Sequence, residues 1–262
     1  MVPPTYTSPL TLSVDCGGGS IKSAVCAPDG TLVTPPTITP THYPFAPVDL
    51  VTLVAKLITD SPVQVDRITV GLPGMIRAGR VIHTPHYIRV NGPRTELNDE
   101  LREQWTGLRL DHALTTATGL PARVINDSEL HGAALVSGRG LEVALTFGTG
   151  LGSSHFLDGQ LQAHLELSHA QFIAGVTYDA YIGEHVRREI GDDAWSERIL
   201  EVIRALQPVF WWDALFIGGG NAHNLSAPAL DALTSMGSHV TVVANHIALT
   251  GGARVWQLAT SS

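Results

Sequence analysis

Three glycine-rich turns, each placed directly after an apolar strand, constrain this chain more than any other feature. They read Gly17-Gly18-Gly19, Gly148-Thr149-Gly150 and Gly218-Gly219-Gly220. Because glycine has no side chain, such turns bring backbone N–H groups close to a ligand, and phosphate oxygens accept these groups well. A fourth apolar segment ends in Asn126-Asp127. Several phosphate-type turns around one strand-end carboxylate indicate phosphoryl transfer, with Asp127 as the base.

Length, charge and cysteine content narrow the class of protein. The chain of 262 residues has room for one large domain or two lobes, and its formal charge of −8 argues against a general nucleic-acid-binding surface. Two cysteines, Cys16 and Cys26, exclude a Cys-rich zinc site and a disulfide framework. Residues 1–9 have no signal-peptide pattern, and no run of about 18 apolar residues predicts a membrane span. We expect a soluble, cytoplasmic protein.

Strands and helices are predicted to alternate along the chain, which is typical of an α/β fold. The predicted strands cover 10–14, 20–27, 31–39, 67–71, 80–83, 123–125, 142–147, 153–157, 213–217 and 239–243. The predicted helices cover 47–59, 96–104, 111–118, 128–137, 178–190, 195–209 and 251–258. The order strand, glycine turn, strand, hairpin turn, strand occurs at 10–39 and again at 142–164, which indicates a structural duplication.

The first turn carries polar neighbours that suit a phosphate site. The glycine amides and the Ser20 hydroxyl would face terminal phosphates, Asp15 would hold Mg²⁺ or its waters, and Lys22 would add positive charge. The alternative is a tight β-hairpin that happens to be rich in glycine.

The second turn is not a dinucleotide fingerprint, because such a loop must open a helix and residues 153–157 are predicted as a strand. No Walker-type loop is present either, which leaves a phosphate clamp in a hairpin. Asn126-Asp127 has two interpretations, a helix cap or a base that takes a hydroxyl proton.

Other candidate residues carry weaker signals. Glu166 and His169 could bind adjacent sugar hydroxyls if both point into a cleft. His83 and His86 are interpreted as a chance pair among twelve histidines rather than a metal site. Cys16 is interpreted as a small buried residue rather than a nucleophile.

Taken in order, these motifs resemble the ROK (repressor, open reading frame, kinase) family of sugar kinases, particularly its polyphosphate-glucokinase-like branch. The resemblance spans roughly Leu10 to Trp256. It is carried by Val70-Gly71-Leu72-Pro73-Gly74, Val124-Ile125-Asn126-Asp127, Leu145 to Ser153, Leu165-Glu166-Leu167-Ser168-His169 and Phe216 to Asn221.

The resemblance implies an actin-like ATPase (ribonuclease H-like), hexokinase-type fold with two lobes and a cleft between them. We expect an N-terminal lobe at 1–125 and a C-terminal lobe at 126–262, with the final helix returning to the first lobe as one option. By the same likeness Asp127 deprotonates the sugar 6-hydroxyl, and other sugar contacts come from Gly74, Asn126, Glu166 and His169.

The resemblance also indicates which residues bind the phosphoryl donor. Gly17 to Gly19 and Gly148 to Gly150 would contact it, and Gly218 to Gly220 would lie near the adenosine of a nucleotide. Mg²⁺ would bridge the donor phosphates. A homodimer is a further expectation, with no interface located.

Three departures from the family pattern stand out. Gly19 occupies a position where the family has Thr or Ser, which puts donor affinity in question. No zinc motif follows His169, so no zinc is expected, and the second acidic sugar ligand is reduced to two candidates, Asp179 and Glu184. Ser168 replaces a glycine, a change that should still permit the turn.

The leading hypothesis is a sugar kinase that uses polyphosphate, ATP or both to phosphorylate glucose or a close hexose. The alternatives are a kinase for another hexose, such as mannose or an N-acetylhexosamine, and a non-catalytic sugar-binding sensor of the same fold. A repressor is disfavoured, because the first strand is expected at about Leu10 and leaves no room for a helix-turn-helix. Polyphosphate would need several cationic contacts, and the candidates are Arg77, Arg80, Arg89, Arg94, Arg187 and Arg188, with ordinary solvated surface residues as the alternative.

Overall fold

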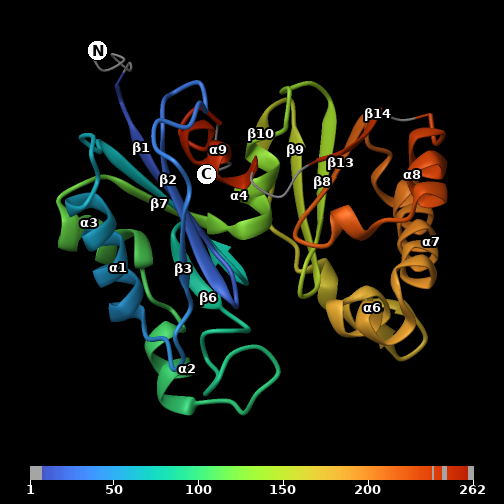
Figure 1. Ribbon diagram of the computed structural model, residues 1–262, viewed down its shortest axis with the longest axis horizontal. Coiled ribbons are helices and arrows are strands. Elements are labelled where there is room, and N and C mark those ends of the chain that lie inside the picture. The colour runs from blue at the N-terminus through green and yellow to red at the C-terminus, as the bar shows by residue number, and fades with distance from the viewer. Residues whose placement is uncertain (1–7, 238, 244–246, 259–262) are drawn as a thin grey trace. The chain divides into compact units, whose positions relative to one another are not determined.

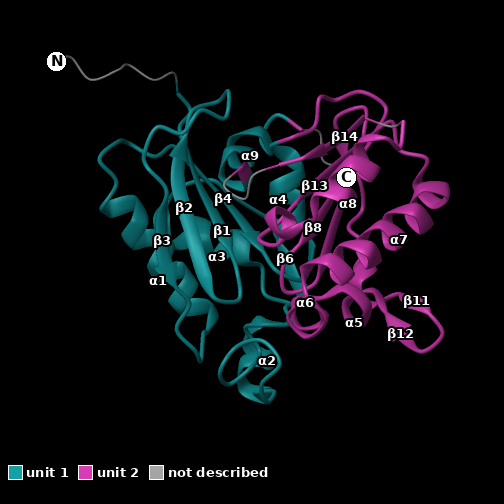
Figure 2. Ribbon diagram, turned by 45° about the vertical axis from the view of Figure 1, so that its right-hand side comes forward, with its two compact units in different colours: residues 1–134, 248–257 teal, residues 135–247, 258–262 magenta. Residues whose placement is uncertain are grey.

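The computed structural model describes residues 8–237, 239–243 and 247–258, which form two compact units. Unit 1 comprises residues 1–134 and 248–257, and unit 2 comprises residues 135–247 and 258–262 (Figure 2). The division falls after Ala134 rather than after Ile125, the predicted end of the first lobe. Asp127 therefore belongs to unit 1, and the final helix also lies in this unit.

Unit 1 is built on a five-stranded mixed sheet (Figure 1). The central strand pairs antiparallel with the strand that follows it and parallel with the strand on its other side. The order across the sheet is β3 (Thr37–Pro40), β2 (Ser20–Cys26), β1 (Thr11–Cys16), β4 (Arg67–Leu72) and β7 (Ala122–Asn126). A separate hairpin of β5 (Met75–Arg77) and β6 (Arg80–His83) follows β4.

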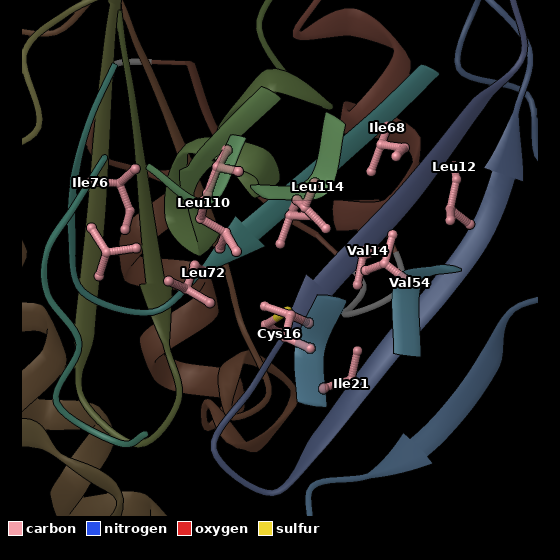
Figure 3. Close-up of a cluster of buried hydrophobic side chains, with 14 of the residues drawn as sticks. Leu12, Val14, Cys16, Ile21, Val54, Ile68, Leu72, Ile76, Leu110 and Leu114 are labelled. Carbon is pink, nitrogen blue, oxygen red and sulfur yellow. The ribbon is translucent and has the colours of Figure 1, made fainter. Parts of the chain in front are cut away.

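One face of this sheet carries the hydrophobic core of unit 1. Successive side chains of a strand point to opposite faces, and the even-numbered residues Leu12 and Val14 of β1 are buried with Val54 and Leu114 (Figure 3). The helices of the unit are α1 (Pro47–Thr59), α2 (Asp99–Trp105), α3 (Leu110–Thr118), α4 (Asp127–Ala133) and α9 (Ala248–Arg254). The bounds of α1 are those predicted from its apolar spacing.

Glycines let α4 and α9 approach the opposite face of the sheet. A Cβ on Gly252 of α9 would overlap Ser13 of β1, and the Thr69 hydroxyl donates to the Gly252 carbonyl at 2.8 Å. A Cβ on Gly71 of β4 would lie 2.8 Å from a methyl group of Leu130 in α4. This close packing explains why α4 stays with unit 1 and moves the division past the predicted boundary.

Unit 2 repeats the strand order and directions of unit 1. Its sheet runs β10 (Gln160–Leu161), β9 (Leu151–Leu157), β8 (Leu141–Phe147), β13 (Ala214–Gly218) and β14 (His239–Val242). As in unit 1, the central strand is antiparallel to the following strand and parallel to its other neighbour. The structural duplication indicated by the sequence is confirmed at the level of topology.

The helices of unit 2 are α5 (Tyr178–Ile182), α6 (Glu184–Ile190), α7 (Asp192–Phe210) and α8 (Ala227–Thr234). A hairpin of β11 (Gln171–Ile173) and β12 (Val176–Thr177) precedes α5, and short 3₁₀ turns cover Leu167–His169 and Ala222–Asn224. The core packs Val143, Leu145 and Phe147 of β8 against Trp195 and Ile199 of α7.

Some local predictions were wrong in extent. The single helix predicted over 178–190 is two helices, because Gly183 is extended (ψ 164°) and a Cβ there would lie 2.6 Å from the Asp179 carbonyl. The strand predicted over 31–39 is reduced to 37–40, after Pro35 and Pro36. The elements β5, β11, β12 and α8 were not predicted, whereas β10 corresponds to the third strand expected within 142–164. Among the described residues, no helix combines the length and apolar character that crossing a bilayer requires.

Candidate functional site

The phosphate-type turn and the candidate base of unit 1 lie at one edge of its sheet. Strands β1, β4 and β7 are parallel, so their carboxyl ends meet at the same edge. The Gly17–Gly19 turn follows β1, Gly74 lies two residues beyond β4, and Asp127 follows β7.

The first glycine turn is a tight hairpin with a charged pair beside it. The Gly17 amide donates to the Ser20 carbonyl at 2.9 Å, which closes the turn. The Lys22 ammonium lies 3.8 Å from the Asp15 carboxylate, and both side chains are about one-fifth exposed (21% and 19%). Burial raises the pKa of Asp15, and the charge of Lys22 partly opposes this. Both residues are thus placed beside the turn that follows β1.

The negative charges of Asp15 and Asp127 both influence the pKa of one buried group, the Cys16 thiol. Burial raises the pKa of Cys16 well above its usual range, and the negative charges of Asp15 and Asp127 raise it further. The thiol is fully buried, so the interpretation of Cys16 as a small core residue is confirmed. Burial is the main cause that raises the pKa of Tyr87, and smaller contributions come from Cys16, Tyr43 and the same two carboxylates. Both carboxylates are thus near enough to the Cys16 thiol to influence its ionisation.

Asn126 works as a helix cap in this structure. Its side-chain oxygen accepts from the Ser128 amide at 2.7 Å, and its own amide N–H donates to Glu129 at 2.8 Å, forming a capping box. Asp127 is the first residue of α4, and its carboxylate accepts from the Ser128 amide at 3.0 Å. An acidic residue is favoured in the first turn of a helix by the helix dipole, and Asp127 and Glu129 both lie in that turn of α4.

Gly74 is joined to this cap. The Asn126 side-chain nitrogen donates to the Gly74 carbonyl at 2.8 Å. Gly74 has φ +114°, and a Cβ there would overlap the His83 carbonyl, so glycine is required at this position. The two residues that were predicted to contact the sugar are therefore held to each other.

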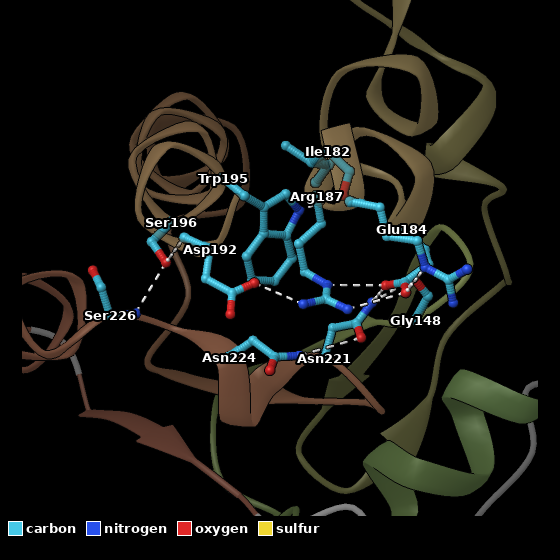
Figure 4. A network of polar contacts seen from close by, with 11 residues as sticks. Gly148, Ile182, Glu184, Arg187, Asp192, Trp195, Ser196, Asn221, Asn224 and Ser226 are labelled. Atoms are coloured by element: carbon cyan, nitrogen blue, oxygen red, sulfur yellow. Dashed lines mark hydrogen bonds and ion pairs between the residues drawn. The ribbon is translucent and has the colours of Figure 1, made fainter. Parts of the chain in front are cut away.

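The second glycine turn, between β8 and β9, is fastened by other segments of unit 2 (Figure 4). The Gly148 carbonyl accepts from the Asn221 side chain at 3.0 Å, and the Thr149 carbonyl accepts from the Glu184 amide at 3.2 Å. The Gly148 amide donates to the Gly150 carbonyl at 3.0 Å. Thr149 is exposed and the two glycines are half-buried, so the turn lies at the surface of its unit.

The Gly218–Gly220 turn lies beside the second turn, since β13 and β8 are parallel neighbours. Gly219 has φ +88°, and a Cβ there would lie 2.5 Å from the Phe147 carbonyl. The Asn221 amide donates to that same carbonyl at 2.8 Å. Glycine is thus needed for the close contact between these two predicted donor-binding turns.

Glu184 is a candidate for the second acidic residue that binds the sugar, and its carboxylate accepts hydrogen bonds from basic and amide groups of the protein. It accepts from Arg187 at 3.0 and 3.1 Å and from Arg188 at 2.7 Å, and it also accepts from Asn221. The Arg187 hydrogen bond is the main cause that lowers the pKa of Glu184 to about 2. Arg187 is 19% exposed and binds both Glu184 and Asp192, which argues against it as a polyphosphate contact, whereas Arg188 is 75% exposed and stays a candidate.

Asp179, the other candidate, supports the second turn. Its carboxylate accepts from the Leu151 amide at 2.8 Å, and a Cβ on Gly150 would overlap it. Both carboxylates that the sequence left open are thus placed around the Gly148–Gly150 turn.

Glu166 is held in its charged form by its neighbours. The Ser168 hydroxyl donates to it at 2.9 Å, and the His164 ring lies 3.7 Å from its other oxygen. Burial works to raise the pKa of Glu166, but the nearby His164 and His169 imidazoles and the hydrogen bond from Ser168 hold it below the usual range. His169 is exposed in the adjoining 3₁₀ turn. His164 is buried, and sequence reasoning missed it although it stands two residues before Glu166.

A metal ion would find few protein ligands here. Among the residues that the structure describes, no three His, Cys, Asp or Glu side chains gather as a metal site. Mg²⁺ commonly takes one or two carboxylates and completes its shell with water and substrate phosphates. The half-buried Asp15 carboxylate beside the first turn fits that limited role.

Comparison with known proteins supports the resemblance seen in the motifs. No protein-family model matches the chain. The polyphosphate glucokinase of Mycobacterium tuberculosis (strains H37Ra and H37Rv) is 25% identical over 218 residues, which cover 79% of this chain and 76% of that protein. The chain is thus similar over most of its length to a polyphosphate glucokinase.

Solved structures of ROK-type kinases share the fold. The inorganic polyphosphate/ATP-glucomannokinase from Arthrobacter sp. strain KM is similar with a TM-score of 0.76 and 22% identity, covering 95% of this chain and 100% of that one. A ROK family glucokinase from Streptomyces griseus, in complex with glucose and AMPPNP, has a TM-score of 0.71 and 17% identity over 94% and 99%. The fold is the actin-like, hexokinase-type fold that the motifs predicted.

Proposed function

We propose that this chain is a ROK-type sugar kinase that transfers a phosphoryl group from polyphosphate, ATP or both to the 6-hydroxyl of glucose or a close hexose. The position of Asp127 carries the proposal: it opens α4 directly after β7, at the sheet edge where the Gly17–Gly19 turn also lies. The similarity to polyphosphate glucokinase supports this choice of donor and sugar.

In the proposed reaction Asp127 is the general base. Its carboxylate takes the proton of the sugar 6-hydroxyl as that oxygen forms a bond to the terminal phosphorus of the donor. The bond between this phosphorus and the bridging oxygen breaks, and the shortened polyphosphate or ADP leaves with the electron pair. The hydrogen bond from the Ser128 amide at 3.0 Å orients the carboxylate for this step.

The donor is assigned to the glycine turns. In unit 1 the amides of the Gly17–Gly19 turn and the Ser20 hydroxyl would bind terminal phosphate oxygens, and Lys22 would add charge. In unit 2 the Gly148–Gly150 turn would bind phosphate, and Gly218–Gly220 would contact the adenosine when ATP is used.

Asp15 would hold a magnesium ion or one of its waters beside the first turn. The bound ion would supply positive charge that offsets the charge developing on the transferred group.

The sugar is assigned to polar groups within each unit. In unit 1 these are Gly74 and the side-chain amide of Asn126, whose nitrogen has a second N–H beyond the one bound by Gly74. In unit 2 they are Glu166 and His169. The lowered pKa of Glu166 keeps it a charged acceptor at neutral pH, and charged acceptors bind hydroxyls strongly.

A coupled assay for sugar 6-phosphate tests the proposal, with glucose, Mg²⁺ and either polyphosphate or ATP. Turnover with one donor supports the kinase, and the ratio of the two rates identifies the preferred donor. A panel that includes mannose and N-acetylhexosamines identifies the sugar. Absence of turnover with every sugar and both donors would overturn the proposal.

A non-catalytic sugar sensor of the same fold is the second candidate, favoured by Gly19 where the family carries a hydroxyl residue. Calorimetric titration with glucose separates the two functions. Sugar binding without any phosphoryl transfer would support the sensor, whereas binding together with turnover would support the kinase.

A further inference from the structure

Hydroxyl groups from other parts of unit 1 donate hydrogen bonds to the first glycine turn. The Tyr87 hydroxyl donates to the Gly17 carbonyl at 3.0 Å, and the Thr41 hydroxyl donates to the same oxygen at 3.2 Å. The Tyr43 hydroxyl donates to the Gly18 carbonyl at 2.8 Å. Two successive carbonyls of a turn without side chains are therefore fixed from outside the turn.

Fixing these carbonyls also fixes the direction of the amides that follow them. In a trans peptide the C=O of one residue and the N–H of the next point in opposite directions, and both peptide links of this turn are trans. With the Gly17 and Gly18 carbonyls bound to hydroxyls, the N–H groups of Gly18 and Gly19 point away from them.

We propose that Tyr43 and Tyr87 are positioning residues whose hydroxyls aim the amides of Gly18 and Gly19 at the terminal phosphate of the donor. This inference rests on the proposed kinase function.

The two tyrosines are anchored well enough to act in this way. Tyr87 is fully buried, and its ring lies 4.9 Å from that of Phe45 and 5.5 Å from that of Trp105. The Trp105 indole N–H donates to the Phe45 carbonyl at 2.9 Å, which locks this aromatic cluster. Burial raises the pKa of Tyr43 to about 12, so its hydroxyl keeps its proton and remains a donor.

The steric surroundings of the turn agree with this assignment. A Cβ on Gly18 would lie 2.8 Å from Pro93 and 3.3 Å from the His86 ring, so this residue is pressed against the 86–93 segment. A Cβ on Gly19 would meet nothing within 4 Å. The Gly19 carbonyl accepts from the Thr41 amide at 3.1 Å, so the backbone of Gly19 is also held, while the Cβ position of Gly19 faces open space.

The test uses Tyr43→Phe and Tyr87→Phe, which remove one hydroxyl each and keep the rings. We expect the KM for ATP or polyphosphate to rise about three- to ten-fold, because losing one hydrogen bond weakens binding by about that factor. The KM for the sugar should stay unchanged. Tyr181→Phe is the matched control, because its hydroxyl donates to Glu201 in unit 2. An unchanged donor KM in both variants, or an equal rise in both KM values, would overturn the proposal.

A second readout needs no substrate. Backbone order parameters of the Gly18 and Gly19 amides, measured by NMR in the free protein, should fall in the tyrosine variants and not in Tyr181→Phe. Unchanged order parameters would also overturn the proposal. If the wild-type protein phosphorylates no sugar, the kinase function fails and the role toward the donor with it, and lower order parameters would then show only that the hydroxyls order the turn.

Discussion

The side chain of Asn221 donates a hydrogen bond to the Gly148 carbonyl at 3.0 Å, and this contact joins two glycine-rich turns of unit 2. The same side-chain nitrogen also binds Glu184, which is itself held by Arg187 (Figure 4). The amide thus serves two acceptors at once, with its position set by a charged network. The arrangement parallels unit 1, where carbonyls of the first glycine turn are also bound by side chains from outside it.

Replacing Asn221 by Asp should weaken donor binding. The substitution keeps the shape but removes both N–H donors and sets a carboxylate against the Gly148 carbonyl and Glu184. We expect the KM for the phosphoryl donor to rise about ten-fold or more, with less change in the KM for the sugar. Asn98→Asp is the matched control, since Asn98 caps α2 and Asp caps helices equally well. Steady-state kinetics with both substrates varied would decide, and an unchanged donor KM would show that the second turn holds its shape without Asn221.

Asp127→Asn should abolish phosphoryl transfer while leaving the fold intact. The amide oxygen can still accept from the Ser128 N–H, but the side chain can no longer take a proton. General-base catalysis contributes about 10²- to 10⁴-fold, so kcat should fall by at least that range with sugar binding retained. Asp99→Asn changes the first residue of α2 in the same way and should leave kcat unaltered. Full activity in folded Asp127→Asn protein would refute Asp127 as the base.

Gly19→Thr should be tolerated and should bind the donor as well as the wild type or more tightly. Gly19 lacks the left-handed φ that would exclude a side chain, and a Cβ there meets nothing within 4 Å. Gly18→Ala provides the contrast, because its Cβ would lie 2.8 Å from Pro93. Donor KM and thermal midpoint should be measured for both variants. A clear loss of donor affinity in Gly19→Thr would show that the turn has a shape that the family hydroxyl does not fit.

Much of the fold could be predicted from local pattern. The apolar spacing of residues 47–59 gave the bounds of α1, and the glycine turns marked the ends of β1, β8 and β13. These features depend on neighbours in sequence. The break at Gly183 depends on the extended backbone of one residue, and the place of α4 in unit 1 depends on close packing between distant segments, which spacing along the chain does not encode.

The candidate site could also be predicted only where local sequence carries the signal. The residues that border the site were recognisable as types, such as Asp127 after a strand and glycines in turns. The roles of Tyr43, Tyr87 and Asn221 were not, because a tyrosine or asparagine that binds a distant carbonyl leaves no mark in its local sequence. Glu184 was one of two candidates for a second acidic sugar ligand, and its carboxylate binds Arg187, one turn along the same helix, and the distant Asn221, which local sequence does not indicate.

Glu166→Gln should weaken sugar binding without changing donor binding. The substitution removes the charge that His164 and Ser168 stabilise, and a hydrogen bond to a charged group is worth about ten- to hundred-fold in affinity. We therefore expect a rise of that order in the KM for the sugar. Glu189→Gln, an exposed position in α6, is the control. Titration calorimetry with glucose gives the same comparison without turnover, and equal affinity in the variant and the wild type would remove Glu166 from the sugar site.

His131 should make unit 1 sensitive to acid. Its Nε2 is buried in α4 without a hydrogen-bond partner among the described residues, and burial, aided by the charge of Lys22, lowers its pKa to about 4. In the unfolded chain the pKa of histidine is about 6.5. Between these values the unfolded state binds a proton that the folded state does not, so folding stability is full above pH 6.5 and falls as the pH drops toward 4.

His131→Leu removes this titration and should flatten the pH dependence. From about pH 7 to about pH 5 the wild type should lose roughly 1–2 kcal/mol of unfolding free energy more than the variant does. Urea unfolding at both pH values measures the difference, and the exposed His42→Leu is the control, which should retain the wild-type slope. Because the comparison uses the change between two pH values, any constant effect of the new leucine on packing cancels. Equal pH slopes in wild type and His131→Leu would show that His131 is accommodated in its charged form.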